Sequence, residues 1–260
     1  MKFCLPHKKT IQYNIFLSTY FVAVVVYGGF IMNTTNCTPQ IIDLSFLASK
    51  QGKSKVDFLA NLREEMLCNS KLRDKAGIEN LVFGNGNPNA DVFFVYEAPS
   101  AEEERSRLAM SGQTGDFFFS LLEKIGISRN DVYVAPIMKY RVKSDFIPRP
   151  PTIDEMAECL PILKRQIEIV KPKLVIALGT TAFGGLMGEN STPTIKDLRG
   201  KIFKFCNRDL MITYYASFLT HYANATHHQQ FLSDITKAIN YINLTPLQQI
   251  LLKLKQKLLG

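Results

Sequence analysis

The stretch from Leu81 to Ser100 constrains the fold of this 260-residue chain more than any other. A turn rich in Gly, Asn and Pro leads into a short apolar run, which breaks at Tyr96-Glu97-Ala98-Pro99-Ser100. Such runs between turn residues are typical of strands buried on both faces of a parallel sheet. Ligands bind at the carboxyl edge of these sheets, so Glu97 is a candidate site residue. A carboxylate here can also cap the next helix, and this alternative stays open.

Composition indicates a globular protein with an anionic partner. Apolar residues make up 46% of the chain and charged residues 21%, which excludes wholesale disorder. The formal net charge of +8 favours binding to nucleic acid or to a membrane surface. The five cysteines are scattered and form no CxxC motif, which favours a reducing, cytoplasmic setting over a disulfide framework.

The N-terminal segment has two interpretations. Tyr13–Ile31 is almost entirely apolar, follows a basic start, and is long enough to span a bilayer. Either the segment anchors the protein in a membrane, or translation begins at Met32 and residues 1–31 are an upstream extension. In the second case the protein is cytoplasmic and touches no membrane.

The remaining chain is predicted to contain three parts. Residues 32–80 form a helical cap, with apolar residues at helical spacing over Ile41–Ser49 and Val56–Leu67. Residues 81–243 form the main domain. Residues 244–260 form an amphipathic basic helix over Pro246–Leu259, for which docking on the domain is favoured over membrane binding.

Alternating strands and helices within residues 81–243 predict an α/β fold. We expect a three-layer α/β/α sandwich with a central, mainly parallel four-stranded sheet. After the strand that ends at Glu97, the expected strands are Val132–Pro136, Lys173–Gly179, Ile202–Cys206 and Leu210–Tyr214. The expected helices are Phe117–Ile125, Thr152–Val170, Thr180–Met187 and His227–Ile242.

Several ordered blocks resemble the family 4 uracil-DNA glycosylases. VFGNGNPNADVFFVYEAPSAEEE, within residues 81–112, is close to that family's VFGEGNPxAxxMFVGEAPGxEED. RQIEIVKPKLVIALG at Arg165–Gly179 and LRGK at Leu198–Lys201 match further family segments. The resemblance extends from about Cys68 to Asn240 and implies the same fold. Members of the family flip a deaminated base out of DNA and cleave its glycosidic bond.

The resemblance also implies roles for residues of the pocket, several of which depart from the family pattern. Glu97 matches the family's catalytic carboxylate, and Tyr215 stands in place of the histidine of its HPAYLL motif. Met110 stands in place of the stacking phenylalanine, and Pro136 in place of the base-reading asparagine. The implied base pocket consists of Tyr96, Pro99, Met110 and Pro136.

DNA is the partner that the resemblance implies, bound by a monomer without a small-molecule cofactor. The basic loop Lys139–Arg149 offers positive charge for phosphate contacts, which need no particular sequence. Phe218 and Leu219 occupy the position of a wedge that enters the DNA. The predicted DNA-binding residues are Lys139, Arg141, Arg149, Ser217, Phe218 and Leu219.

The iron–sulfur cluster of the family is expected to be absent. Cys68 and Cys159 stand where the first and last cluster ligands belong, but Lys71 and Tyr140 replace the other two. Two thiolates cannot hold a four-iron cluster that needs four. We therefore expect no cofactor and no metal.

Three hypotheses about function remain open. The first is a protein of the base-excision repair type that binds DNA with weak or no uracil excision. The second is an active glycosylase with a substituted pocket, in which Glu97 positions water and Tyr215 donates a hydrogen bond. The third is a non-catalytic remnant, in which Glu97 is a helix cap and the basic loop is a solvated face.

Overall fold

The computed structural model describes residues 12–17, 20–27, 30–33, 41–43, 54–144, 147–188 and 194–259. These residues belong to two compact units, Met1–Ser54 and Lys55–Gly260.

The first unit contains an antiparallel meander. Its strands are β1 (Gln12–Leu17), β2 (Tyr20–Tyr27), β3 (Phe30–Asn33) and β4 (Ile41–Asp43), paired in that order. The helix predicted from Ile41 is wrong for Ile41–Asp43, because these three residues pair with β3 and two of them are β-branched isoleucines, which favour strands. Residues 44–49 of that prediction lie outside the described residues. Among the helices in the described ranges, none has the length and apolarity that crossing a membrane requires.

Four parallel strands form the centre of the second unit, as predicted. They are β6 (Val92–Tyr96), β7 (Val132–Pro136), β10 (Leu174–Leu178) and β12 (Arg208–Thr213). The sheet order is β11-β12-β10-β6-β7-β5, so two antiparallel edge strands extend it to six, β5 (Asn85–Gly86) and β11 (Ile202–Phe205). Every residue of β6, β7 and β10 is buried, as expected for strands covered on both faces.

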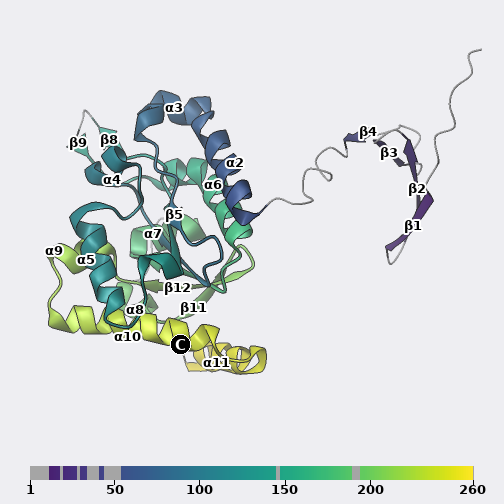
Figure 1. The fold of residues 1–260 in the computed structure, drawn as a ribbon. Helices are drawn as coiled ribbons and strands as arrows, with labels where there is room; N and C mark the ends of the chain where they lie inside the picture. Colours follow the sequence, from purple (N-terminus) through teal and green to yellow (C-terminus); the bar gives the residue numbers. More distant parts are fainter. Residues whose placement is uncertain are drawn as a thin grey trace, which may run out of the picture. The chain divides into compact units, whose positions relative to one another are not determined.

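Alternate residues of each central strand enter two separate cores. Phe93 and Val95 of β6 pack with α6 (Ile153–Val170), α7 (Thr180–Met187) and α2 (Lys55–Leu67). Val92 and Phe94 pack on the other face with α5 (Gly112–Glu123) and α10 (Ala225–Ile242). The period of two along a strand therefore produces the three-layer α/β/α sandwich (Figure 1).

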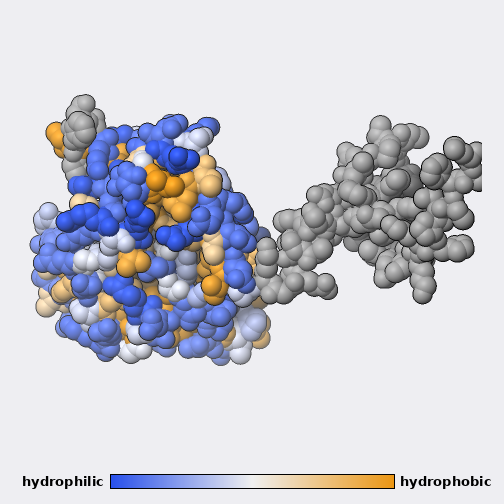
Figure 2. Space-filling model, turned by 45° about the horizontal axis from the view of Figure 1, so that its top comes forward, coloured by the Kyte–Doolittle hydropathy of each residue, from blue (hydrophilic) through white to orange (hydrophobic). Residues whose placement is uncertain are grey.

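Short elements complete the second unit. Two 3-10 turns, η1 (Ile78–Asn80) and η2 (Arg129–Asp131), precede strands, and β8 (Lys143–Ser144) pairs with β9 (Ile147–Pro148). The remaining helices are α3 (Ser70–Ala76), α4 (Ala101–Ser106), α8 (Ile195–Leu198), α9 (Ala216–His221) and α11 (Pro246–Leu259). The face shown in Figure 2 is mainly hydrophilic, with apolar residues gathered in small areas.

The C-terminal helix α11 has the predicted bounds and contacts the domain through glutamines. Gln249 donates to the carbonyl of Tyr241 at 3.0 Å, and Gln256 accepts from the backbone N–H of Ile202 at 3.3 Å. Leu247, Ile250 and Leu251 are exposed. The helix thus contacts the domain, as favoured, but with polar side chains and not with these three apolar ones.

Candidate active site

A cleft opens at the carboxyl edge of the parallel sheet. Its volume is about 520 Å³, and its walls come from the ends of β6 and β10 and from the first residues of α4, α5, α7 and α9. Glu97, Met110, Thr181, Tyr215 and Ser217 all line it. This is where ligands bind in open α/β sheets. The structure therefore brings Glu97 and Tyr215 together, although they are far apart in sequence.

Glu97 faces this cleft and does not cap a helix. It directly follows β6, is half-buried, and its carboxylate is hydrogen-bonded by the Thr181 side chain. Burial raises the pKa of Glu97, and the hydrogen bond from Thr181 acts in the opposite direction. Ser100 is the N-cap of α4, in a capping box with Glu103. The alternative that Glu97 caps the next helix is therefore wrong.

Glu103 holds one wall of the cleft together. Its side chain is 5% exposed and accepts hydrogen bonds from the Tyr96 hydroxyl, from Met110 N at 2.6 Å and from Ser100 N at 2.8 Å. Burial, together with Glu103, raises the pKa of Tyr96, so this phenol stays a proton donor. Glu103 thus fixes three segments around the cleft.

Met110 has an unusual backbone that its neighbours enforce. Its φ is 53°, in the left-handed region, and its carbonyl accepts from Arg129 Nη1 at 2.8 Å. A Cβ on Gly115 would lie 1.9 Å from the Met110 carbonyl oxygen, so only glycine allows this approach. The Met110 side chain is consequently held at the cleft wall.

Tyr215 is the most exposed aromatic ring in the described lining of the cleft. It occupies the N-cap position of α9 and is 45% exposed, and its ring centroid lies 5.6 Å from that of Phe218. Gly179, at φ 91°, allows this placement, because a Cβ there would lie 2.9 Å from Tyr215 Cβ. The tyrosine ring is therefore available to a ligand in the cleft.

A buried ion pair anchors the end of β12, just before Tyr215. Asp234 of α10 accepts from Thr213 Oγ1 at 2.8 Å and from Arg199 Nε at 3.0 Å. Burial raises the pKa of Asp234, while Thr213 and Arg199 lower it. Arg199 belongs to the LRGK segment and lies 5.2 Å from the Tyr214 ring centroid. The segment thus orients the loop that carries Tyr215.

The other predicted pocket and wedge residues divide between the cleft and the core. Tyr96, Pro99 and Ser217 line the cleft. Pro136 pairs with Tyr96 in the sheet, but it is not among the described residues that line the cleft. Phe218 is partly buried and stacks on Tyr214 at 5.4 Å, and Leu219 is 1% exposed. The expected exposure of the Leu219 wedge is therefore wrong, because this side chain packs in the core.

The basic loop begins with a buried amine. Lys139 has no exposed surface, and its Nζ donates to the carbonyls of Pro136 at 2.7 Å and Phe83 at 3.1 Å and to Gln166 Oε1 at 2.8 Å. The expectation that Lys139 faces the solvent is therefore wrong. The turn after β7 directs this side chain inward, where three oxygens replace its water.

The Lys139 pKa predicts a pH dependence of stability. Burial lowers the pKa of Lys139 to about 7, whereas a lysine in an unfolded chain titrates near about 10.4. Between these values the unfolded chain binds more protons, so the free energy of unfolding rises with pH, by up to about 1.4 kcal/mol per pH unit. Below this window Lys139 is protonated in both states, and the full cost of burying its charge remains. Lys139→Met should remove this contribution to the slope.

The measurement is urea unfolding between about pH 7 and about pH 9, the lower part of that window. Lys124→Met, at an exposed position after α5, is the matched control and should keep the slope of the unmodified protein. If the free energy of unfolding changes equally with pH in the unmodified protein and in Lys139→Met, the pKa of Lys139 is not lowered in the folded protein.

The remaining cations of the loop are paired with carboxylates. Lys143 Nζ lies 3.0 Å from Glu104 Oε2, and Arg141 Nη1 lies 3.9 Å from the same oxygen. Arg149 donates to both oxygens of Glu155, at 2.8 and 2.6 Å. Part of the positive charge predicted for DNA is thus balanced within the protein.

A family model matches the part of the chain that forms this sheet and cleft. The model of the uracil-DNA glycosylase superfamily matches residues 83–240, more than half of the chain. The chain belongs to the uracil-DNA glycosylase superfamily. The match includes β6 and Glu97, the four parallel strands, and Tyr215. The resemblance seen in the sequence is thereby confirmed.

Similar proteins within the superfamily are type-4 uracil-DNA glycosylases. The protein of Sulfurisphaera tokodaii is 29% identical over 199 residues, covering 74% of this chain and 87% of the relative. That of Thermotoga maritima is 32% identical over 164 residues, covering 63% and 83%. That of Archaeoglobus fulgidus is 32% identical over 127 residues, covering 48% and 62%.

The residues at the implied cluster positions do not fit a four-iron cluster. Cys159 is fully buried in α6, Cys68 is exposed after α2, and Lys71 and Tyr140 supply no thiolate. Within the described ranges, no group of three or more His, Cys, Asp or Glu side chains is placed to hold a metal. Four thiolates are the usual requirement for such a cluster.

Three residues that shape the cleft were not predicted from the sequence: Glu103, Thr181 and Gly179. The Ser100-x-x-Glu103 pattern is a capping-box signature, which could have identified the first. Thr181 follows β10 at the same sheet edge as Glu97, so strand order could have indicated it. The role of Gly179 depends on its approach to Tyr215, which no local pattern reveals.

Proposed function

We propose that this superfamily member binds DNA, accepts one extruded base in the Glu97 cleft, and releases uracil at or near the background rate without an iron–sulfur cluster. The observation that carries the proposal is the composition of the cleft. Among the described residues that line it, there is no Asn, Gln or His. The described lining thus supplies neither an amide side chain to read a base edge nor an imidazole to stabilise the departing uracil.

The surfaces needed to hold a base are nevertheless present. Met110 offers an apolar wall and the exposed Tyr215 offers an aromatic ring. Stacking on an aromatic ring contributes roughly 1–3 kcal/mol per base and tolerates any base. A cleft of about 520 Å³ is within the usual size of small-molecule sites. These features support base binding in preference to base discrimination.

The chemical groups that remain support only weak catalysis. The hydroxyl donors in the cleft come from neutral side chains such as Thr114, Thr181 and Tyr215. The Pro136 carbonyl, the polar atom left at the position of the base-reading amide, already accepts from Lys139. Removing one donor to a developing negative charge typically costs about a hundred- to a thousand-fold in rate.

An active enzyme is a second candidate, favoured by one observation. Glu97 and Tyr215 line the same cleft, and burial raises the pKa of Glu97, as at many catalytic carboxyl groups. In this alternative Glu97 positions water and Tyr215 donates to the leaving base. The two candidates differ in uracil release by the unmodified protein.

Base binding in the cleft can be tested by blocking it. Ser217 is exposed and lines the cleft, so Ser217→Trp should fill the mouth. We expect the unmodified protein to bind a uracil-containing single strand about ten-fold more tightly than the same strand with an abasic analogue, about 1.4 kcal/mol and within the range of one stacked base. Ser217→Trp should remove this preference. Fluorescence anisotropy of labelled strands measures both affinities.

The matched control is Ser120→Trp, at an exposed position of α5 that does not line the cleft. It should retain the preference for uracil. An unchanged preference in Ser217→Trp would show that the base does not enter the cleft.

A further inference from the structure

A second, smaller cleft lies beside α4, and basic side chains surround it. Its volume is about 280 Å³. We call it the cationic cleft and define it by the cations and the tyrosine that line it. These residues are Lys75, Tyr140, Arg141, Lys143 and Arg149. Two carboxylates, Glu104 and Glu155, also line it, so the cations of the lining outnumber its carboxylates.

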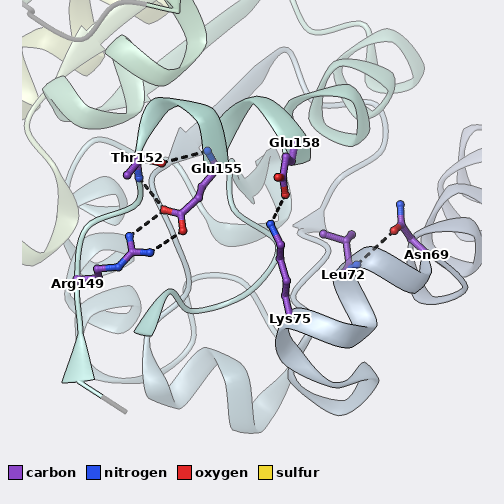
Figure 3. Close-up of polar contacts among 7 residues, drawn as sticks. All are labelled: Asn69, Leu72, Lys75, Arg149, Thr152, Glu155 and Glu158. Atoms are coloured by element: carbon purple, nitrogen blue, oxygen red, sulfur yellow. Dashed lines mark hydrogen bonds and ion pairs between the residues drawn. The ribbon is translucent and has the colours of Figure 1, made fainter. Parts of the chain in front are cut away.

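Most of these cations are held in place by carboxylates. Lys75 of α3 pairs with Glu158, and Arg149 binds Glu155 through both oxygens, so two segments are tied to α6 (Figure 3). Lys143 contacts both oxygens of Glu104, at 3.0 and 3.2 Å. The positive rim of the cationic cleft is therefore ordered in advance of any ligand.

Among the described residues, two donors of the cationic cleft have no hydrogen-bond partner. Arg141 approaches Glu104 only to 3.9 Å, and within the described part of the chain its guanidinium makes no hydrogen bond. The Tyr140 hydroxyl likewise has no hydrogen-bond partner among the described residues, although the side chain is 5% exposed. Burial raises the pKa of Tyr140, which keeps this hydroxyl protonated.

The chemistry of these donors indicates the ligand. A guanidinium and a phenol beside ammonium groups are well suited to the oxygens of a phosphate, and arginine binds them through two N–H groups. Tyr140 stands where the family resemblance implies a cluster cysteine. The substitution thus removes a metal ligand and adds a hydrogen-bond donor.

The position beside α4 indicates that the phosphate belongs to DNA. Glu103 holds the wall of the Glu97 cleft, and the next residue, Glu104, lines the cationic cleft. Adjacent Cα atoms are about 3.8 Å apart, and α4 is about 9 Å long, so one nucleotide strand can reach both clefts. We propose that the cationic cleft binds a backbone phosphodiester of the strand whose base enters the Glu97 cleft, an inference that rests on the proposed function.

The test uses two variants of the full chain, Arg141→Gln and Tyr140→Phe, with single-stranded DNA at several salt concentrations. Loss of one phosphate contact lowers the slope of log affinity against log salt by about 0.7 for single strands. We expect this change for Arg141→Gln. Tyr140→Phe keeps the ring and should weaken binding severalfold without changing the slope. Arg63→Gln, at an exposed position on α2, is the matched control and should change neither.

Each outcome decides the inference. If Arg141→Gln has the same salt slope and affinity as Arg63→Gln while the unmodified protein binds DNA, the cationic cleft is not the phosphate site. The base-binding proposal is then unaffected. If the slope falls as expected but Ser217→Trp keeps the uracil preference, the phosphate site stands and base binding in the cleft fails. Absence of DNA binding at low salt overturns both. Titration with inorganic phosphate adds a further arm: binding that Arg141→Gln abolishes, with unchanged DNA affinity, would assign the cleft to free phosphate and overturn the inference.

Discussion

Uracil release from single-stranded DNA should rise about a hundred-fold when Pro136→Asn and Tyr215→His are combined in one chain. The two changes restore an amide near the base edge and an imidazole beside the leaving group. Pro136 ends β7 next to Tyr96, and Tyr215 is 45% exposed in the cleft that contains Glu97.

Single-turnover release of uracil measures this gain. Each single variant should gain less than the double variant. The gain of the double variant need not equal the sum of the two single gains, because groups that act on one transition state are not additive. Pro136→Asn combined with Tyr222→His is the matched control, since Tyr222 is 75% exposed and does not line the cleft. A folded double variant that stays at the rate of this control would show that these two substitutions do not limit activity.

Glu103→Ala should lower the free energy of unfolding by about 3–5 kcal/mol. Three donors lose their acceptor together, the Tyr96 hydroxyl and the N–H groups of Met110 and Ser100. The first two are buried, and each unsatisfied buried group costs about 1–3 kcal/mol, whereas the Ser100 N–H is only partly buried and adds less. Water that enters the space offsets part of this sum. Urea unfolding measures the loss.

The control for this prediction is Glu123→Ala, an exposed position at the last residue of α5. It should change stability by about 0.5 kcal/mol or less. A loss below about 1 kcal/mol in Glu103→Ala would mean that Glu103 does not hold the cleft wall in solution. The uracil preference of Glu103→Ala should also fall, because the Met110 loop loses its anchor.

The central sheet could be predicted because its strands have a strong local signal. Val132–Pro136 is short, apolar and bounded by turn residues, and the observed β7 has the same bounds. Edge strands such as β5 and β8 contain two residues each, too few for any periodicity. They form through pairing with partners, which composition does not encode.

The site was predictable where position along a strand decides the outcome. Glu97 lies at the carboxyl edge of β6, which strand order alone indicates. Lys139 illustrates the opposite case. Its partners are the Phe83 carbonyl, 56 residues away, and Gln166, 27 residues away, so the sequence shows a basic loop where the fold has a buried amine.

Uracil release by the unmodified protein distinguishes a DNA-binding member of the superfamily with little activity from an active glycosylase. Single- and double-stranded oligonucleotides with one uracil are incubated with the unmodified chain and with Glu97→Gln, and free uracil is measured. We expect release at or near the rate without protein, with little difference between the two chains. Robust release by the unmodified chain that Glu97→Gln abolishes would contradict it, and would assign catalysis to Glu97 and Tyr215 in a substituted pocket.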